Sequence, residues 1–133
     1  MRTSMYATGK YKYADTVGIL LKYNASKIEL ERLKNEKIFW APYADHARDE
    51  VWEYINTMHD KVKSLLNLRH EIEQAIDSLE DTRHRLIMRL RYIDGMCWED
   101  ISEKVHYEYR WVLRLHRDAL KILSEKHFSD VKI

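Results

Sequence analysis

The sequence predicts an all-α protein in which an N-terminal antiparallel helical hairpin or coiled coil precedes a compact group of C-terminal helices. Two observations support this prediction. The 133 residues include only three glycines and one proline, so few positions interrupt a helix. Apolar residues also recur at steps of three and four along most of the chain, which is the period of an amphipathic helix. We therefore expect helices joined by short connections.

The first expected helix follows a short arm. Residues 1–13 have no helical period and are expected to form a flexible arm. Helical spacing of apolar residues begins near Ala14 and lasts until about Trp40. The residue before Pro42 is disfavoured in the α conformation, so the first helix should stop near Trp40 and a second should begin around Asp45.

The second expected helix carries the strongest apolar periodicity, a heptad seam over four repeats. Together the two helices make residues 14–80 a hairpin or coiled coil. The second helix, from Asp45 to Leu79, is the longer of the two, so the first should cover only part of the seam. A second copy of the chain is expected to cover the rest. The expected dimer interface consists of Ile55, Met58, Val62, Leu65, Arg69, Ile72 and Ile76.

Arg69 is the one polar residue in that seam. It could be a packing defect, a side chain that extends to solvent, or a residue that sets the register of the pairing. The third role is the best attested for such an intrusion.

Residues 81–123 are expected to form three further helices. Asp81 is a cap-type residue before the first of them, and Gly95 can adopt the positive φ that ends it. Helix, glycine turn, short helix, tight turn and longer helix is the order of a helix-turn-helix. The expected helices are 82–94, 98–105 and 109–123, and residues 124–133 form a tail without a clear pattern.

Basic residues recur on one side of the last helix. Arg110, Arg114, Arg117 and Lys121 follow one another at steps of four, three and four. Arginine is suited to guanine edges, and both residue types bind phosphates. Arg85 and Arg89, one turn apart in the expected helix 82–94, are expected to contact phosphates. The alternative is a solvated face with no partner. The expected DNA-binding residues are Tyr109, Arg110, Leu113, Arg114, Arg117, Lys121, Arg85 and Arg89.

Three motifs in this region carry a family resemblance: RYIDG before the short helix, WEDI at its start and LHRDAL in the last helix. They resemble small phage and prophage proteins of Gram-positive bacteria whose C-terminus is similar to region 4 of sigma factors. These include a family of conserved phage proteins of unknown function and the ArpU-like late-gene regulators. The resemblance covers about residues 79–123. It implies binding to double-stranded DNA, control of phage genes and contact with RNA polymerase.

Two positions depart from that family's pattern. Cys97 stands where a Ser or Thr cap is common, and cysteine caps poorly, so the short helix should be less firmly held. Glu108 stands where Ser is often found at the start of the last helix. Glu108 could accept a hydrogen bond from cytosine N4 or repel phosphates. The departures therefore affect the expected sequence preference more than the expected fold.

Other classes of site find less support. Trp98 and Trp111 are expected in the core rather than as base-stacking platforms. The seven histidines and the single cysteine lack paired ligand spacing, so no metal site is expected. The sequence has many Asp and Glu residues but neither a phosphate-binding loop nor a catalytic arrangement around them. We therefore expect neither an enzyme nor a bound cofactor.

The composition favours a reducing cytoplasm, and the family resemblance implies that of a bacterial host cell. Cys97 has no partner for an internal disulfide, and no apolar stretch is long enough for a signal peptide or a membrane span. The net charge is +1, but residues 1–82 carry 12 Lys and Arg against 14 Asp and Glu, whereas residues 83–133 carry 11 against 8. The sequence thus favours a dimeric DNA-binding regulator. The alternative is a coiled-coil protein that acts on a host protein.

Overall fold

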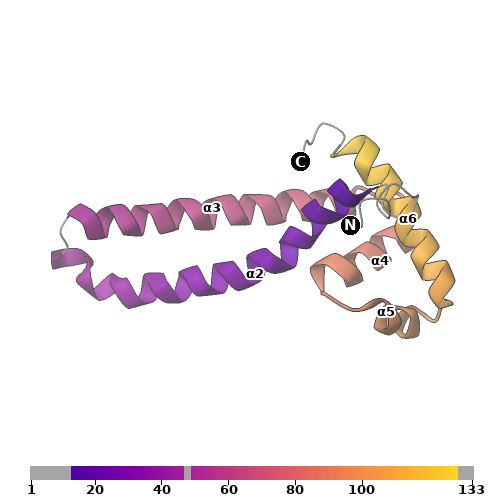
Figure 1. The fold of residues 1–133 in the computed structure, drawn as a ribbon, viewed down its shortest axis with the longest axis horizontal. Coiled ribbons are helices and arrows are strands. Elements are labelled where there is room, and N and C mark those ends of the chain that lie inside the picture. The colour runs from indigo at the N-terminus through magenta and orange to yellow at the C-terminus, as the bar shows by residue number, and fades with distance from the viewer. Residues whose placement is uncertain (1–12, 47–48, 129–133) are drawn as a thin grey trace, which may run out of the picture.

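The computed structural model describes residues 13–46 and 49–128, and every regular element within them is a helix. The all-α class is therefore confirmed. Two long helices form a hairpin that projects from a compact head of shorter helices (Figure 1). The arm expected over residues 1–13 lies outside the described residues except for Tyr13, and so do the last five residues of the expected tail.

The hairpin consists of α2 (Ala14–Trp40) and α3 (Asp49–Asp77), joined at the far end by the 3₁₀ helix η2 (Ala41–His46). The two long helices run antiparallel and side by side (Figure 1). They contain 27 and 29 residues, so the expectation that α2 is too short to cover α3 is wrong. The difference arises because η2 occupies the positions where α3 was expected to begin.

The heptad seam is covered from within the same chain. Near the tip, Ile55 and Met58 are buried in one cluster with Leu33 of α2. At the other end, Ile72 and Ile76 are fully buried in a cluster that includes α2 residues. Because these four α3 side chains are enclosed by their own chain, the expected dimer interface through them is corrected to an intramolecular one. Val62 and Leu65 pack against the tip cluster as partly buried side chains.

Arg69 joins the two helices of the hairpin. Its Nη2 donates to the hydroxyl oxygen of Tyr23 at 3.2 Å, and its guanidinium lies 4.9 Å from the centre of the Tyr23 ring. The Tyr23 hydroxyl in turn donates to Glu73. Burial and the hydrogen bond to Glu73 raise the pKa of Tyr23, while Arg69 opposes this shift. The polar residue of the seam thus pairs α3 with one position of α2, as a register-setting residue would.

The head contains α4 (Thr82–Met88), the π-helical turn η3 (Arg89–Ile93), α5 (Trp98–Val105) and α6 (Tyr109–Lys126). A single α-helix was expected over residues 82–94. Instead the last turn widens, and α2 supplies donors to its carbonyls: Asn24 bonds the oxygen of Tyr92 at 3.1 Å, and Lys27 bonds that of Ile93. These bonds satisfy carbonyls that a helix end leaves free, which stabilises the altered turn.

The ends of the head helices follow their local sequence. Oδ1 of Asp81 accepts from the backbone N–H of Arg83 at 2.8 Å, which confirms the expected cap of α4. The hydrogen bonds from Arg83 hold the pKa of that carboxyl well below its usual range. Cys97 precedes α5 without a side-chain cap, as expected for cysteine. α6 continues three residues beyond the expected Leu123, and Phe128 packs against the core just after it ends.

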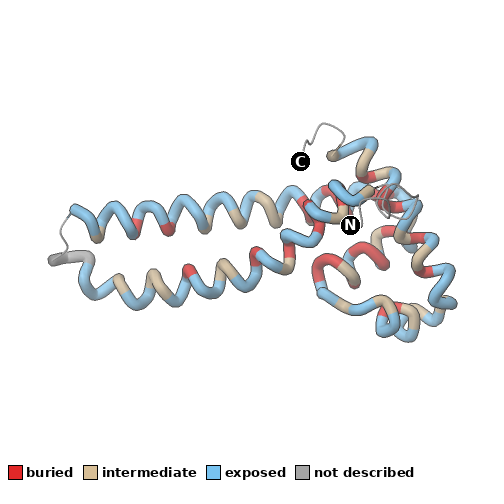
Figure 2. The backbone as a smooth tube through the Cα atoms, viewed as in Figure 1, coloured by how far each residue is buried: buried red, intermediate tan, exposed pale blue. Residues whose placement is uncertain are grey.

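Buried positions concentrate in the head and at the base of the hairpin, and become sparse towards the tip (Figure 2). One cluster, which we call the shared core, combines residues of the hairpin and the head. A second, the head core, lies between α4, η3, α5 and α6. The shared core consists of Ile19, Leu20, Tyr23, Ile72, Ala75, Ile76, Leu79, Met88, Tyr92, Ile93, Ala119, Leu120 and Leu123. The head core consists of Ile87, Leu90, Ile101, Val112 and Leu115.

We expect Gly95→Ala and Gly18→Ala to change stability in opposite directions. Gly95 has φ +75°, and a Cβ there would lie 3.3 Å from Nδ2 of Asn24, so the alanine should cost about 1–2 kcal/mol. Gly18 lies within α2 with nothing within 4 Å of an added Cβ, so its alanine should stabilise by about 0.5–1 kcal/mol. Urea unfolding measures both, and equal effects of the two alanines would contradict the role given to the positive φ.

Candidate nucleic-acid interface

The solvent side of α6 carries a row of basic side chains, which we call the arginine face. The opposite side of α6 is buried and includes Val112, Leu115 and Ala119. α6 therefore packs by one side and leaves the other free for a partner. The arginine face consists of Tyr109, Arg110, Leu113, Arg114, Arg117 and Lys121, all exposed except for the half-buried Leu113.

His116 lies at the edge of the buried side and fastens α6 to the head. Its Nε2 is 2.7 Å from the hydroxyl oxygen of Tyr92, and its ring centre is 4.4 Å from that of Trp98 at the start of α5. Burial, with a smaller contribution from Arg91, lowers the pKa of His116 to about 4. The imidazole is therefore neutral at pH 7, and the site packs an uncharged ring next to the arginine face.

α5 supports α6 through a short turn. His106 ends α5 in the left-handed conformation with φ 60°, and Oγ of Ser102 donates to the carbonyl of Tyr107 at 2.6 Å. Ile101 is fully buried in the head core together with Val112 and Leu115 of α6. The orientation of α6 is thus fixed by both the turn and the packing.

Arg83 of α4 lies against Trp111 of α6, beside the arginine face, a contact that the spacing of residues did not predict. Trp111 was expected in the core but is exposed, and the guanidinium of Arg83 lies 5.8 Å from the centre of its ring. The expectation failed because Trp111 lies about 100° around the helix from the middle of the buried stripe at Val112. Trp98, in contrast, packs against the head core as expected.

The two α4-region arginines expected at phosphates bond to their own chain. Nη1 of Arg85 donates to the carbonyls of Leu79 and Glu80, which follow α3. Arg89 forms an ion pair of 3.0 Å with Asp77 in α3. The structure therefore brings together the six α6 residues but ties Arg85 and Arg89 to the hairpin junction. These bonds could not be predicted from spacing along the arginines' own helix, because two acceptors lie in the connection after α3 and the third lies in α3.

The charge of the arginine face is modest. Residues 108–121 contain four basic and two acidic residues, a net charge of +2, and both acids, Glu108 and Asp118, are exposed. A row of guanidinium groups can donate to phosphate oxygens and to the O6 and N7 atoms of guanine. Such a face suits an anionic polymer, with affinity that depends on salt.

Neither a metal-ligand cluster nor a membrane-spanning helix occurs in the part of the chain that the structure describes. Within residues 13–46 and 49–128, no three His, Cys, Asp or Glu side chains come together as a metal ion would need. No helix there is long and apolar enough to cross a membrane. Cys97 is exposed and carries a free thiol.

The geometry defines an all-α protein in which a long helical hairpin carries a compact head. The chain belongs to the family described as "Protein of unknown function (DUF1492)", whose model matches residues 44–124, more than half of the chain. The match extends from η2 through α3 and the head, and it leaves α2 outside. Neither the curated proteins nor the solved structures gave a match. The description of the family assigns it no function.

Proposed function

We propose that this protein binds double-stranded DNA through the arginine face and regulates transcription. The observation that carries the proposal is the exposure of four cations on one side of α6 while the opposite side is buried in the head. An α-helix has a diameter of about 10–12 Å with its side chains, which matches a major groove about 12 Å wide. In this proposal α5 braces α6, and the two act as a helix-turn-helix.

The finer parts of the proposal rest on the resemblance to region 4 of sigma factors. It supports a role in the control of phage or prophage genes in the bacterial cytoplasm, with contact to RNA polymerase and without enzymatic activity. A homodimer stays part of the proposal because one face of charge +2 should bind weakly. Its interface would have to lie outside the enclosed seam of the hairpin.

The experiment is a salt titration of binding to a random-sequence DNA duplex. If the four cations each neutralise one phosphate, affinity should fall about 100-fold between about 50 and 200 mM salt, a slope near −3.6 on logarithmic axes. Arg114→Ala combined with Arg117→Ala should halve that slope and weaken binding to every sequence. Fluorescence anisotropy with a labelled duplex measures both quantities.

A matched control removes two charges from the hairpin instead. Lys61 and Lys63 are exposed in α3, so Lys61→Ala combined with Lys63→Ala changes the net charge equally and should leave the slope unchanged. Circular dichroism checks that both variants keep their helices. Equal slopes in the arginine variant and the wild type would reject the arginine face. No duplex binding by the wild type at about 50 mM salt would reject the function.

A second candidate function is binding to a host protein through the hairpin. It is favoured by apolar side chains that the hairpin leaves exposed, such as Ile28, Ile38, Phe39 and Leu66. Exposed apolar groups that lie together are typical of protein interfaces. This candidate does not compete with DNA binding for the same surface.

A further inference from the structure

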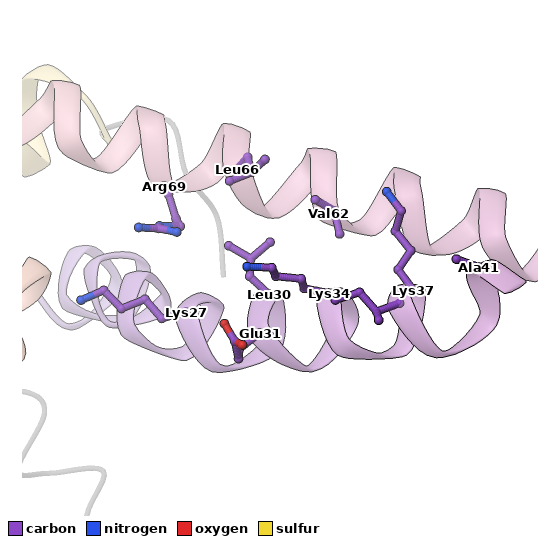
Figure 3. Close-up of a pocket in the computed structure, with 10 residues that line it drawn as sticks. Lys27, Leu30, Glu31, Lys34, Lys37, Ala41, Val62, Leu66 and Arg69 are labelled. Atoms are coloured by element: carbon purple, nitrogen blue, oxygen red, sulfur yellow. The ribbon is translucent and has the colours of Figure 1, made fainter.

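The middle of the hairpin contains an open groove between α2 and α3, with a volume of about 660 Å³. Its floor is apolar and includes Leu30 and Ile38 of α2 and Val62 and Leu66 of α3. Val62 and Arg69 reach towards α2 from α3, and Leu30 reaches towards α3 (Figure 3). Leu66 is 50% exposed and Ile38 62%, so the hairpin leaves much of this apolar surface in contact with water.

The apolar core of the hairpin is divided into two clusters, and the groove passes the point where they meet. Val62 and Leu65 pack against the tip cluster, whereas the shared core begins at Ile72 on α3 with Leu68 packed against it. Arg69 lies where the heptad pattern calls for an apolar residue, and its side chain turns towards Tyr23. At Arg69 the two helices therefore lack one apolar contact of the heptad pattern.

The rim of the groove is strongly basic. Lys27, Lys34, Lys37 and Arg69 line it together with a single carboxylate, Glu31, which gives the rim a net charge of +3. We call this site the basic groove. The ion pairs of the described residues involve Arg32, Arg83 and Arg89 as cations and none of the four on the rim.

The rim cations have donors to spare. Lys37 meets only a ring nitrogen of His59, at 3.3 Å, among the hydrogen bonds of the described residues. Nε of Arg69 is buried and has no hydrogen-bond partner among them. A buried N–H without an acceptor is unfavourable, which is a cost of holding Arg69 in the seam.

We propose that the basic groove binds an acidic amphipathic helix of a partner protein. The wall formed by α2 and the start of η2 runs from Lys27 to Ala41, about 21 Å, which accommodates about four turns of a partner helix. Apolar side chains of that helix would cover Leu30 and Leu66 and complete a three-helix bundle. Carboxylates spaced by seven residues would face Lys27 and Lys34, in the manner of the charged flanking positions of a coiled coil.

Charge favours an acidic helix of a partner protein over a second copy of this chain and over this chain's own terminal segments. If the basic grooves of two copies faced each other, eight cations would meet only two carboxylates, and the copies would repel each other. Residues 1–12 contain Arg2, Lys10 and Lys12 and no acidic residue, so they would also be repelled. Residues 129–133 hold one acid and one base and are too few to fill the groove.

The experiment uses the full-length protein and a synthetic peptide of about 15 residues with leucine at the a and d positions and glutamate at e and g. We expect saturable binding by fluorescence anisotropy. A peptide with lysine in place of glutamate should bind at least about 10-fold more weakly, and so should one with serine in place of leucine. Leu66→Ala should weaken the glutamate peptide because it removes part of the floor.

Charge reversal assigns the site. Lys34→Glu combined with Lys37→Glu should reverse the preference between the glutamate and lysine peptides. Lys61→Glu combined with Lys63→Glu adds the same charge to α3 outside the groove lining and should leave the preference unchanged. Arg114→Ala combined with Arg117→Ala should bind peptide like the wild type, so failure of DNA binding and failure of this proposal are distinguishable.

Three results would overturn the proposal. One is the absence of binding by the glutamate peptide, and another is equal binding by the glutamate and lysine peptides. The third is self-association of the protein that Leu66→Ala abolishes in sedimentation, which would assign the groove to a second copy.

Discussion

We expect Ile76→Ala to lower the free energy of unfolding by about 2–5 kcal/mol. Ile76 is fully buried in the shared core, where α3 meets residues of α2 and α6. Removing its side chain leaves a cavity that the surrounding helices cannot close without moving. Because hairpin and head contribute to the same cluster, both should lose stability together. Urea unfolding followed by circular dichroism and by tryptophan fluorescence measures the loss, and the two transitions should coincide.

Leu66→Ala is the matched control for that experiment. Leu66 lies in the same helix but is 50% exposed, so its truncation should change stability by no more than about 0.5 kcal/mol. If both alanine variants were equally stable, the shared core would not be the element that unites hairpin and head. Separate unfolding transitions in the wild type would lead to the same conclusion.

We expect acid to destabilise the head through His116, by about 3 kcal/mol between pH 6.5 and about 4. The pKa of His116 is about 4 in the folded protein and 6.5 as its ordinary value, so the unfolded chain takes up the proton more readily. The contribution of the neutral ring is therefore complete above pH 6.5. It declines as the pH falls towards 4 and changes no further below that value.

His116→Gln isolates this contribution from the other acidic transitions. Glutamine does not titrate but can still hydrogen-bond the hydroxyl of Tyr92. The variant should lose about 3 kcal/mol less stability than the wild type when the pH is lowered from 7 to 4. Urea unfolding at several pH values measures the difference. If the free energy of unfolding changed with pH in the same way for both proteins, the pKa of His116 would not be lowered by burial and Arg91 as described.

Much of the head could be predicted because its signals are local. Asp81 caps the turn that directly follows it, and Gly95 adopts the positive φ that its sequence position suggested. The bounds Trp98–Val105 of α5 also follow from apolar spacing alone. The exposure of Arg114 and Arg117 comes from the same periodicity, since the opposite side of α6 carries the apolar residues.

The remaining features depend on contacts between distant parts of the chain. The π turn at Arg89–Ile93 is bonded by Asn24 and Lys27, which no local pattern connects to it. The ion pair of Arg89 likewise depends on Asp77, which lies in another helix. The closure of the heptad seam by α2 depended on where α3 begins, and helix boundaries are the weakest part of a pattern-based prediction.

Lys27 connects the basic groove to the head. Its stem lines the groove, while its ammonium donates to the carbonyl of Ile93 at the end of the π turn. An ammonium has three donors, so a carboxylate in the groove can bind a second one without displacing Ile93. The conformational entropy of fixing this long side chain is then lost once for two bonds. If an acidic helix occupies the groove as proposed, its binding and the firmness of the turn that leads to α5 are thermodynamically linked, and each changes the other by the same free energy.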